Sequence, residues 1–295
     1  MNSKVYPTLK VHAWGGLGSQ LFAIALIIDL KTRFPKRNME LVLHNGGVTK
    51  RPPEVLGLIP NLRIRAIDDY SLNIPAKNSS KLSDKISSRR FFLNCAKLIC
   101  IKLGLISHGN TNYQWKTVKP WVIAFRGHYS SREISEDVLS LIYKKLLAFN
   151  TLKNKEPYNR DVEAAIHYRL GDLLHLKNKQ QIRLQRLSNI INSPRLSNIH
   201  EYTVFSDSPK EAIELLCDIK TRKRFTKLNL DTCEMLICAS KAKTFIGTNS
   251  KLSIWIIIFQ QIRNENYVFY LPAELCAILK SIYPRLAKNL DTAIY

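Results

Sequence analysis

The chain is poor in acidic side chains: 23 aspartate and glutamate residues stand against 45 lysine and arginine residues, giving a formal net charge of +22 over 295 residues. Such an excess favours phosphate-rich partners, which include nucleotide sugars, nucleic acid and an anionic membrane face. The alternative is that the lysines only keep the protein soluble. Hydrophobic content of 45% and charged content of 23% are ordinary for a globular protein, which argues against wholesale disorder.

The sequence also lacks a membrane span, a signal peptide and a zinc-type cysteine pattern. The apolar stretch Leu21–Ile28 follows a glycine-rich turn rather than a basic segment, and the later run Ile254–Phe259 is far too short to cross a bilayer. Six cysteines form no CxxC pair, and most lie in apolar runs, as expected of reduced thiols in the cytoplasm. We therefore expect a cytoplasmic protein that is not integral to the membrane.

Length and pattern predict two α/β domains. A chain of this size fits two domains of about 150 residues each. The polar segment Thr151–Arg160 contains Pro157 and marks the boundary, so we expect domains at 1–155 and 156–295. In each half, apolar strand-like runs alternate with helix-like stretches, which is a βαβ pattern. The expected strands are 9–14, 40–44, 62–67, 121–125, 162–167, 202–205, 243–246 and 267–270, and the main expected helices are 19–33, 210–217, 231–241 and 251–263.

Polar groups follow three of the apolar strands at a turn, and parallel strands place such groups at one edge of a sheet. Arg169 comes just after the strand that ends at His167, where its planar, permanently charged fork is suited to two phosphate oxygens. Asp172 is placed to orient that fork. The alternative reading is a buried structural pair of Arg169 and Asp172.

Two further strand ends carry hydrogen-bonding groups. Asp207 follows the strand at 202–205 and is suited to a base edge or a ribose hydroxyl, although Asp207 or Ser208 is equally suited to cap the next helix. The run Gly247-Thr248-Asn249-Ser250 precedes an apolar helix and predicts a pyrophosphate site that needs no metal. Ordinary capping by Asn249 or Ser250 explains only part of that run.

Two other features are less specific. The turn Gly15-Gly16-Leu17-Gly18 fits a dinucleotide fingerprint only in part, because Leu21 stands at the third glycine position. Residues 81–103 combine six lysines and arginines with nine large apolar residues and a single acid, Asp84. Such a segment is typical of a helix on an anionic membrane surface, and the alternative is a core-facing helix with a solvated cationic side.

In their order and spacing, these pieces resemble the bacterial α-1,2-fucosyltransferases of glycosyltransferase family 11. The family's GGLGNQ corresponds to Gly15–Gln20, its HxRRGD to His167–Asp172, its FSDD to Phe205–Ser208, and its NSSFSWW to Asn249–Trp255. Four matches in order, covering about residues 9 to 260, are a more specific signal than any one of them.

The resemblance implies a GT-B-like fold with two facing Rossmann-like domains, an N-terminal acceptor side and a C-terminal side that binds GDP-fucose. It implies transfer of fucose to a galactoside hydroxyl in O-antigen or capsule synthesis, with inversion, no cofactor and no metal. Separately from the resemblance, the basic segment at 81–103 suggests a lipid-linked glycan acceptor and contact with the inner membrane face. The implied catalytic residues are Arg169, His167 and Asp172, and the implied donor-binding residues are Gly16, Gly18, Ser19, Gln20, Asp207, Thr248, Asn249, Ser250 and Ser253.

Four positions depart from the family pattern: Leu170 replaces an arginine, Ser19 an asparagine, Ser208 an aspartate and Ile254 a tryptophan. A GT-B transferase for another nucleotide sugar is therefore an alternative. A basic nucleic-acid-binding protein is a more remote one, since no known nucleic-acid-binding signature is present. His12, His128 and His167 are candidates by type for a general base, but no one of them is singled out.

Overall fold

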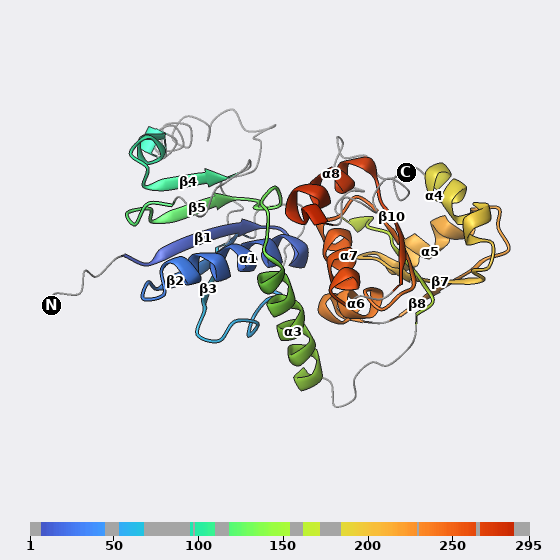
Figure 1. Ribbon diagram of the computed structural model, residues 1–295. Coiled ribbons are helices and arrows are strands. Elements are labelled where there is room, and N and C mark those ends of the chain that lie inside the picture. The colour runs from blue at the N-terminus through green and yellow to red at the C-terminus, as the bar shows by residue number, and fades with distance from the viewer. Residues whose placement is uncertain are drawn as a thin grey trace, which may run out of the picture. The chain divides into compact units, whose positions relative to one another are not determined.

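In the computed structural model, the described residues are 7–44, 53–67, 95–96, 98–109, 118–153, 162–171, 184–228, 230–263 and 266–285. The chain divides into two compact units, Met1–Arg132 and Glu133–Tyr295. Each contains a five-stranded sheet in which all the described strand pairs are parallel (Figure 1). These two sheets confirm the predicted α/β class and the predicted Rossmann-like parallel sheet in each half of the chain.

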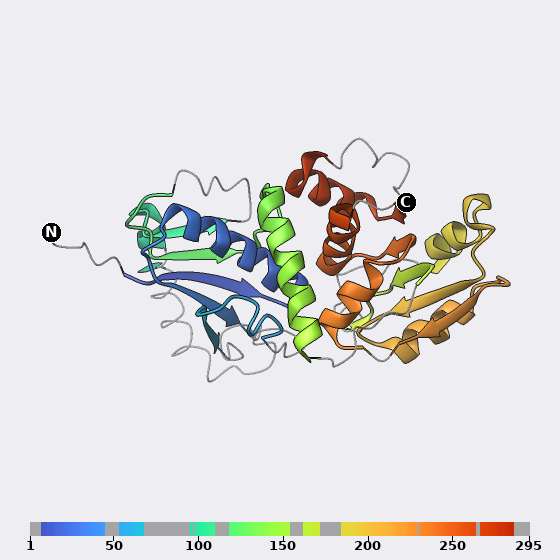
Figure 2. The same cartoon turned by 60° about the horizontal axis from the view of Figure 1, so that its bottom comes forward.

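The first unit has the strand order β3-β2-β1-β5-β4. Helix α1 covers β1 and β2 and is buried along nearly its whole length, because apolar residues occupy most of its positions (Figure 2). The elements of this unit are β1 (Leu9–Trp14), α1 (Leu17–Arg33), β2 (Met39–His44), β3 (Arg63–Ile67), β4 (Ile106–Gly109) and β5 (Ala124–Gly127).

The second unit has the strand order β10-β9-β6-β7-β8. One apolar core packs helices α4 and α5 against β6 and β7, around the buried Tyr168 and Tyr202. The elements are α3 (Glu136–Lys153), β6 (Ala164–His167), α4 (Leu184–Ile191), the 3₁₀ turn η3 (Pro194–Leu196), β7 (Glu201–Phe205), α5 (Pro209–Cys217), β8 (Arg224–Lys227), α6 (Thr232–Ala239), β9 (Thr244–Gly247), α7 (Lys251–Arg263), β10 (Val268–Tyr270) and α8 (Ala273–Ile282).

The division between the units falls before α3, whereas the sequence analysis placed it after that helix, between residues 155 and 156. The physical reason is packing: α3 contacts α6 and α7 of the second unit, with Tyr143 against Phe259. The amide of Asn150 also donates a hydrogen bond to the carbonyl of Cys233. Helix α3 therefore begins the second unit instead of ending the first.

Most other expected elements are present, with local differences. β5 begins at Ala124, not Trp121, because residues 119–122 form a turn in which Val122 N–H donates to Lys119 O. The short strands β4 and β8 and the helices α4 and α8 were not expected from the sequence. Most of the basic segment at 81–103 lies outside the described residues. Of the part that is described, residues 95–96 and 98–102 are helical. None of the described helices is both long and apolar enough to span a bilayer.

Candidate functional site

The sheet of the second unit changes direction next to β6. From β6 the chain adds β7 and β8 on one side, and then β9 and β10 on the other. Ligands of open α/β sheets bind outside the carboxyl ends of the strands at such a switch point. His167 ends β6 and lies in register with Gly247, the last residue of β9, and with Phe205, the last residue of β7. Three predicted strand ends therefore meet at one edge.

Thr248 joins two of these strand ends. Its backbone N–H and its hydroxyl both donate to the carbonyl of His167, at 3.0 and 2.7 Å. The same hydroxyl oxygen accepts the backbone N–H of Arg169 at 2.9 Å. Thr248 is fully enclosed, so its hydroxyl is used to fix the backbone from which Arg169 projects.

Asp207, at the end of β7, holds the other side of the Arg169 loop. One carboxylate oxygen, Oδ1, accepts the backbone N–H groups of Leu170 and Gly171, each at 3.0 Å. The other oxygen, Oδ2, lies 3.9 Å from Nε of Arg169. Both side chains keep about a quarter of their surface exposed. The carboxylate of Asp207 therefore orients the guanidinium of Arg169, which remains accessible to a ligand.

His167 and Ser253 connect the end of β6 to the beginning of α7. The Ser253 hydroxyl donates to the carbonyl of Thr248. Because the hydroxyl proton is used in that bond, Nδ1 of His167, which lies 2.8 Å from Oγ of Ser253, carries a proton and donates to Oγ. Burial is the main cause that lowers the pKa of His167 to about 4, and Arg169 lowers it further while Asp207 opposes the shift. The imidazole is neutral at neutral pH and only 3% exposed, which makes it a positioning residue.

The rest of the 247–250 run divides between packing and exposure. A Cβ on Gly247 would lie 2.8 Å from Cβ of Ser253 and 2.5 Å from Leu271, so only glycine allows this close approach. Ser250 is buried, and its hydroxyl oxygen accepts the N–H of Leu252. Asn249 is exposed. Of the four predicted donor-binding residues from Thr248 to Ser253, the hydroxyls of three serve the protein itself, and Asn249 faces solvent.

Two expectations at this edge have different outcomes. Asp172 lies outside the described residues, and it is Asp207 that makes the ion pair with Arg169. Ser208, not Asp207, is the N-cap residue of α5, and its side chain makes no capping hydrogen bond. The helix-cap alternative therefore holds for the position of Ser208, whereas the carboxylate of Asp207 is bound to the neighbouring strand end.

The predicted residues Gly16, Gly18, Ser19 and Gln20 lie in the first unit, where Gly16 is the N-cap of α1 and the other three belong to the first turn of that helix. Gly15 has a φ of 96°, a conformation that favours glycine. The Gln20 amide donates to the carbonyl of Gly15 and accepts the N–H of Glu54. Gln20 therefore holds the turn in shape from a buried position.

A cluster that the sequence analysis did not predict lies at the carboxyl ends of β1, β2 and β5. Strand register brings His12, Trp14, His44 and Arg126 to one face of the sheet. Nδ1 of His12 is 2.7 Å from Nε2 of His44, and the Trp14 and His44 rings stack with centroids 4.3 Å apart. The guanidinium of Arg126 lies 5.2 Å from the centre of the Trp14 ring. Only the positions of these residues at strand ends signalled this cluster in the sequence.

Burial lowers the pKa of His12 to about 3, and the charges of Arg126 and His44 add to the effect. His12 is therefore neutral at physiological pH. Its backbone carbonyl accepts the hydroxyl of Tyr129, which follows β5 with a φ of 55°. The cluster is therefore a closely spaced imidazole pair, of which His12 is neutral, beside an aromatic ring and one arginine.

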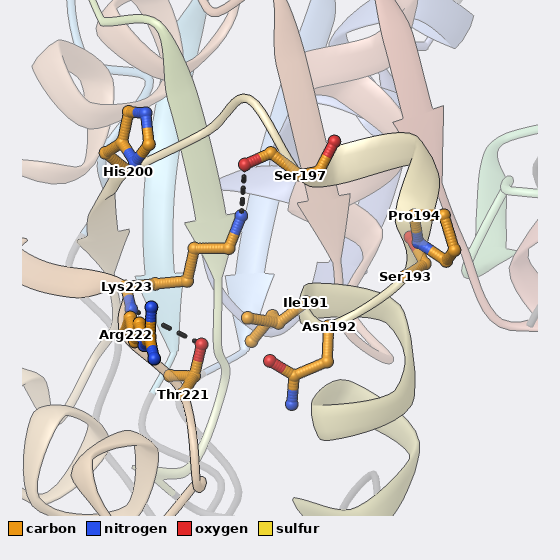
Figure 3. A pocket seen from close by; sticks show the side chains of 9 residues that line it. All are labelled: Ile191, Asn192, Ser193, Pro194, Ser197, His200, Thr221, Arg222 and Lys223. Carbon is orange, nitrogen blue, oxygen red and sulfur yellow. Dashed lines mark hydrogen bonds between the residues drawn. The ribbon is translucent and has the colours of Figure 1, made fainter.

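A pocket of about 320 Å³ lies at the opposite, amino-terminal edge of the second sheet (Figure 3). It is lined by residues that precede β7 and β8, among them His200, Arg222 and Lys223. The ammonium of Lys223 donates to the carbonyls of Leu196, Ser197 and Ile199 and so closes a loop. None of the predicted site residues lines this pocket.

In the described ranges, no group of three or more His, Cys, Asp or Glu side chains is arranged to hold a metal ion, and the expected metal independence stays a prediction.

Comparison with known proteins finds no matching family model and no matching curated protein. Among solved structures, the chain is similar to the Escherichia coli heptosyltransferase WaaC with an ADP-heptose analogue, at 11% identity and a TM-score of 0.43, over 90% of this chain and 88% of that one. It is similar to POFUT1 in complex with GDP-fucose, at 12% identity and a TM-score of 0.36, over 90% and 96%. It is also similar to a mutant of Arabidopsis thaliana FUT1 with GDP, at 8% identity and a TM-score of 0.42, over 88% and 69%. Similarities of this size carry no conclusion about the site of this chain.

Proposed function

We propose that this protein is an inverting glycosyltransferase that uses a nucleotide-sugar donor. The observation that carries the proposal is the setting of Arg169: a partly exposed guanidinium at the switch point of a parallel sheet, with its backbone fixed by Thr248 and its loop fixed by Asp207. A fixed cation at that place suits a diphosphate, whose two phosphates carry the charge that a guanidinium fork binds.

The proposed reaction is a single displacement. An acceptor hydroxyl oxygen forms a bond to the anomeric carbon while the bond from that carbon to the β-phosphate oxygen breaks, and the hydroxyl proton leaves to a base. Negative charge develops on the departing diphosphate, so a preorganised donor there stabilises the transition state more than the ground state. Arg169 is the proposed catalytic residue because its guanidinium would contact that charge.

The proposed donor-side positioning residues are His167, Thr248 and Ser253, which lock the ends of β6 and β9 together. Exposed Asn249 is the proposed side-chain contact to the donor, beside the beginning of α7. We assign the acceptor to the first unit, at the cluster of His12, Trp14, His44 and Arg126, because an aromatic ring edged by polar groups suits a sugar.

For the substrate, we propose transfer of fucose from GDP-fucose to the 2-hydroxyl of a galactoside in a surface glycan, in the cytoplasm and without a metal. The support is the order of four sequence motifs, three of which lie in the second unit at or just after the ends of β6, β7 and β9. The proposal does not depend on the similarities to solved structures.

A second candidate is transfer of another sugar from its nucleotide. Leu170 and Ile254, two of the departures from the motif pattern, are both fully buried. This chain carries one arginine, Arg169, where the family pattern has two. Leu170, at the position of the second arginine, belongs to the apolar core of the second unit. A site with one fewer cation at the diphosphate is a specific reason to test other donors.

A thermal-shift panel separates these readings, because a ligand that binds only the folded state raises the melting temperature. The panel contains GDP-fucose, other GDP-sugars, UDP-sugars and an RNA oligomer. We expect a selective rise with GDP-fucose and release of GDP when a galactoside is added. A selective rise with a different nucleotide sugar would establish the second candidate, and a rise with RNA alone would overturn both.

A further inference from the structure

The helical residues 98–102, the residue after them and the turn before β5 present large apolar side chains to solvent at the same edge of the first sheet. Leu98, Ile99 and Leu103 are 57 to 63% exposed, and Trp121 is 54% exposed. The indole nitrogen of Trp121 lies 3.5 Å from where a Cβ on Gly104 would be, next to Leu103. We call these four side chains the apolar face. They are half of the large apolar side chains that are exposed in the described part of the chain.

The helix end fixes the position of Leu103. Gly104 N–H donates to the carbonyl of Ile101, and Leu105 N–H donates to the carbonyl of Cys100, which together form a Schellman motif. Gly104 has a φ of 68°, as the residue after the C-cap of such a motif requires. Ile123 N–H then donates to Leu105 O and ties this helix end to the strand that carries the turn.

The turn that presents Trp121 is held by a buried arginine. The guanidinium of Arg37 donates to the carbonyls of Pro120 and Val122, on either side of Trp121. It also donates to Pro7 O at 2.9 Å. Pro120 and Trp121 are exposed, whereas Val118 and Val122 are buried. The hydrogen bonds from Arg37 therefore fix the backbone on both sides of Trp121 while the indole ring stays exposed to solvent.

The charge beside the apolar face has one sign. Lys102 and Lys119 are exposed, and the ammonium of Lys119 lies 5.9 Å from the centre of the Trp121 ring. Residues 95–105 and 118–123 contain no acidic side chain. A second copy of this chain, itself at +22, would bring the same lysines against them, whereas anionic lipid headgroups would neutralise them.

We propose that the apolar face and its two lysines dock the protein on an anionic lipid bilayer. Trp121, Leu98, Ile99 and Leu103 enter the interfacial region, and Lys102 and Lys119 contact the headgroup phosphates. The sequence indicated only the 81–103 segment; Trp121 and Lys119 come from a turn that folding brings beside it. Because the face lies at the amino-terminal edge of parallel strands, docking leaves the carboxyl ends of β1, β2 and β5 away from the lipid.

The test is cosedimentation of the full chain with vesicles of phosphatidylcholine alone or mixed with phosphatidylglycerol, at low and high salt. We expect binding to the anionic vesicles, weakened by salt. Each lysine near an anionic surface contributes about a fivefold change in binding, so replacing Lys102 and Lys119 by Gln should weaken it about 30-fold. Replacing Leu103 by Gln and Trp121 by Ser should weaken it at least about tenfold.

The matched control is the pair Leu56→Gln and Leu152→Gln, which removes two side chains that are 52 and 88% exposed elsewhere. Circular dichroism and melting temperature verify that each variant is folded. Equal binding of the face variants and the control pair, or no preference for anionic vesicles, would overturn the proposal. So would light scattering that shows a dimer dissociated by the face variants. Vesicle binding is measured without nucleotide or acceptor, so its result is independent of the transferase proposal.

Discussion

Gly171 has no side chain because the carboxylate of Asp207 occupies that space: a Cβ at residue 171 would overlap Oδ2 of Asp207. The closeness lets Oδ1 accept the N–H groups of Leu170 and Gly171 together. Two strand ends are thereby joined immediately beside Arg169. The guanidinium is held by backbone geometry as much as by its own ion pair.

Replacing Gly171 by Ala should therefore separate the β6 loop from Asp207 and displace Arg169. We expect donor binding and turnover to fall by at least about tenfold, since small displacements of a positioned group are costly. Isothermal titration with the donor and a GDP-release assay measure the effect. Gly104→Ala is the control. The positive φ of Gly104 makes an alanine strained there, but this residue lies in the first unit, just before β4. The variant should therefore lose stability and keep its donor affinity.

Replacing Arg169 by Ala should lower turnover by about 100- to 1,000-fold, the usual loss when one donor to a developing anion is removed. The melting temperature should change little, because the side chain is partly exposed. Arg169→Lys should recover only part of the activity, since a point charge does not reproduce the fork. Arg222→Ala, at the opposite edge of the same sheet, is the control. Near-normal turnover in Arg169→Ala would refute its catalytic role.

Introducing the second arginine of the HxRRGD pattern, by Leu170→Arg, should harm this protein. Leu170 is fully buried in the core of the second unit, and an unpaired guanidinium there would cost about 3–5 kcal/mol of unfolding free energy. Ser208→Asp, which introduces the second aspartate of the FSDD pattern at a partly exposed N-cap, should be neutral or slightly stabilising. Urea denaturation compares the two. A stable, active Leu170→Arg variant would show that the core there is more open than described.

Acidification should destabilise the protein in a defined window. In the folded state the pKa of His167 is lowered to about 4 and that of His12 to about 3, against an ordinary value of 6.5. Below pH 6.5 the unfolded chain takes up protons that the folded chain does not, so stability is lost as pH falls from 6.5 towards 4. Melting temperatures across this range test the prediction. His167→Gln should be less stable at pH 7 and show a shallower decline than the wild type.

Asp29 on α1 and Arg132 form a buried ion pair, and breaking it should strongly lower the free energy of unfolding of the first unit. Both side chains are almost fully buried, and burial lowers the pKa of Arg132 although Asp29 opposes the shift. Asp29→Asn should cost about 3–5 kcal/mol, because it leaves a buried guanidinium without its counter-charge. The double variant Asp29→Leu with Arg132→Met should cost less than the single variant. A double variant as unstable as the single one would mean that packing, not charge, is decisive.

Local pattern was enough for much of the fold. β1 has the bounds expected from its apolar run, and α7 begins and ends where the sequence indicated. These elements carry long apolar stretches between clear glycine or polar boundaries, so their formation depends little on distant residues. The edge strands β4 and β8 were missed because each is four residues long and has no apolar run: β4 is Ile-Ser-His-Gly and β8 is Arg-Phe-Thr-Lys.

The candidate site was predicted by position but not by role. Arg169, Asp207 and Thr248 were selected because each follows a strand, and the parallel sheet brings them together. That Asp207 pairs with Arg169, or that the hydroxyls of Thr248 and Ser253 are used internally, depends on distances between residues about 40 to 90 positions apart. No local pattern contains those distances.

By itself, then, the sequence determined the two α/β units and the strand ends at which polar groups gather, because hydrophobic periodicity and glycine turns act over a few residues. Only the tertiary structure decided which of those groups remain exposed, how His12 meets His44, and that Trp121 stands in solvent beside Leu103. Strand register and a single buried guanidinium, Arg37, set these relationships, and both act between segments that are far apart in the chain.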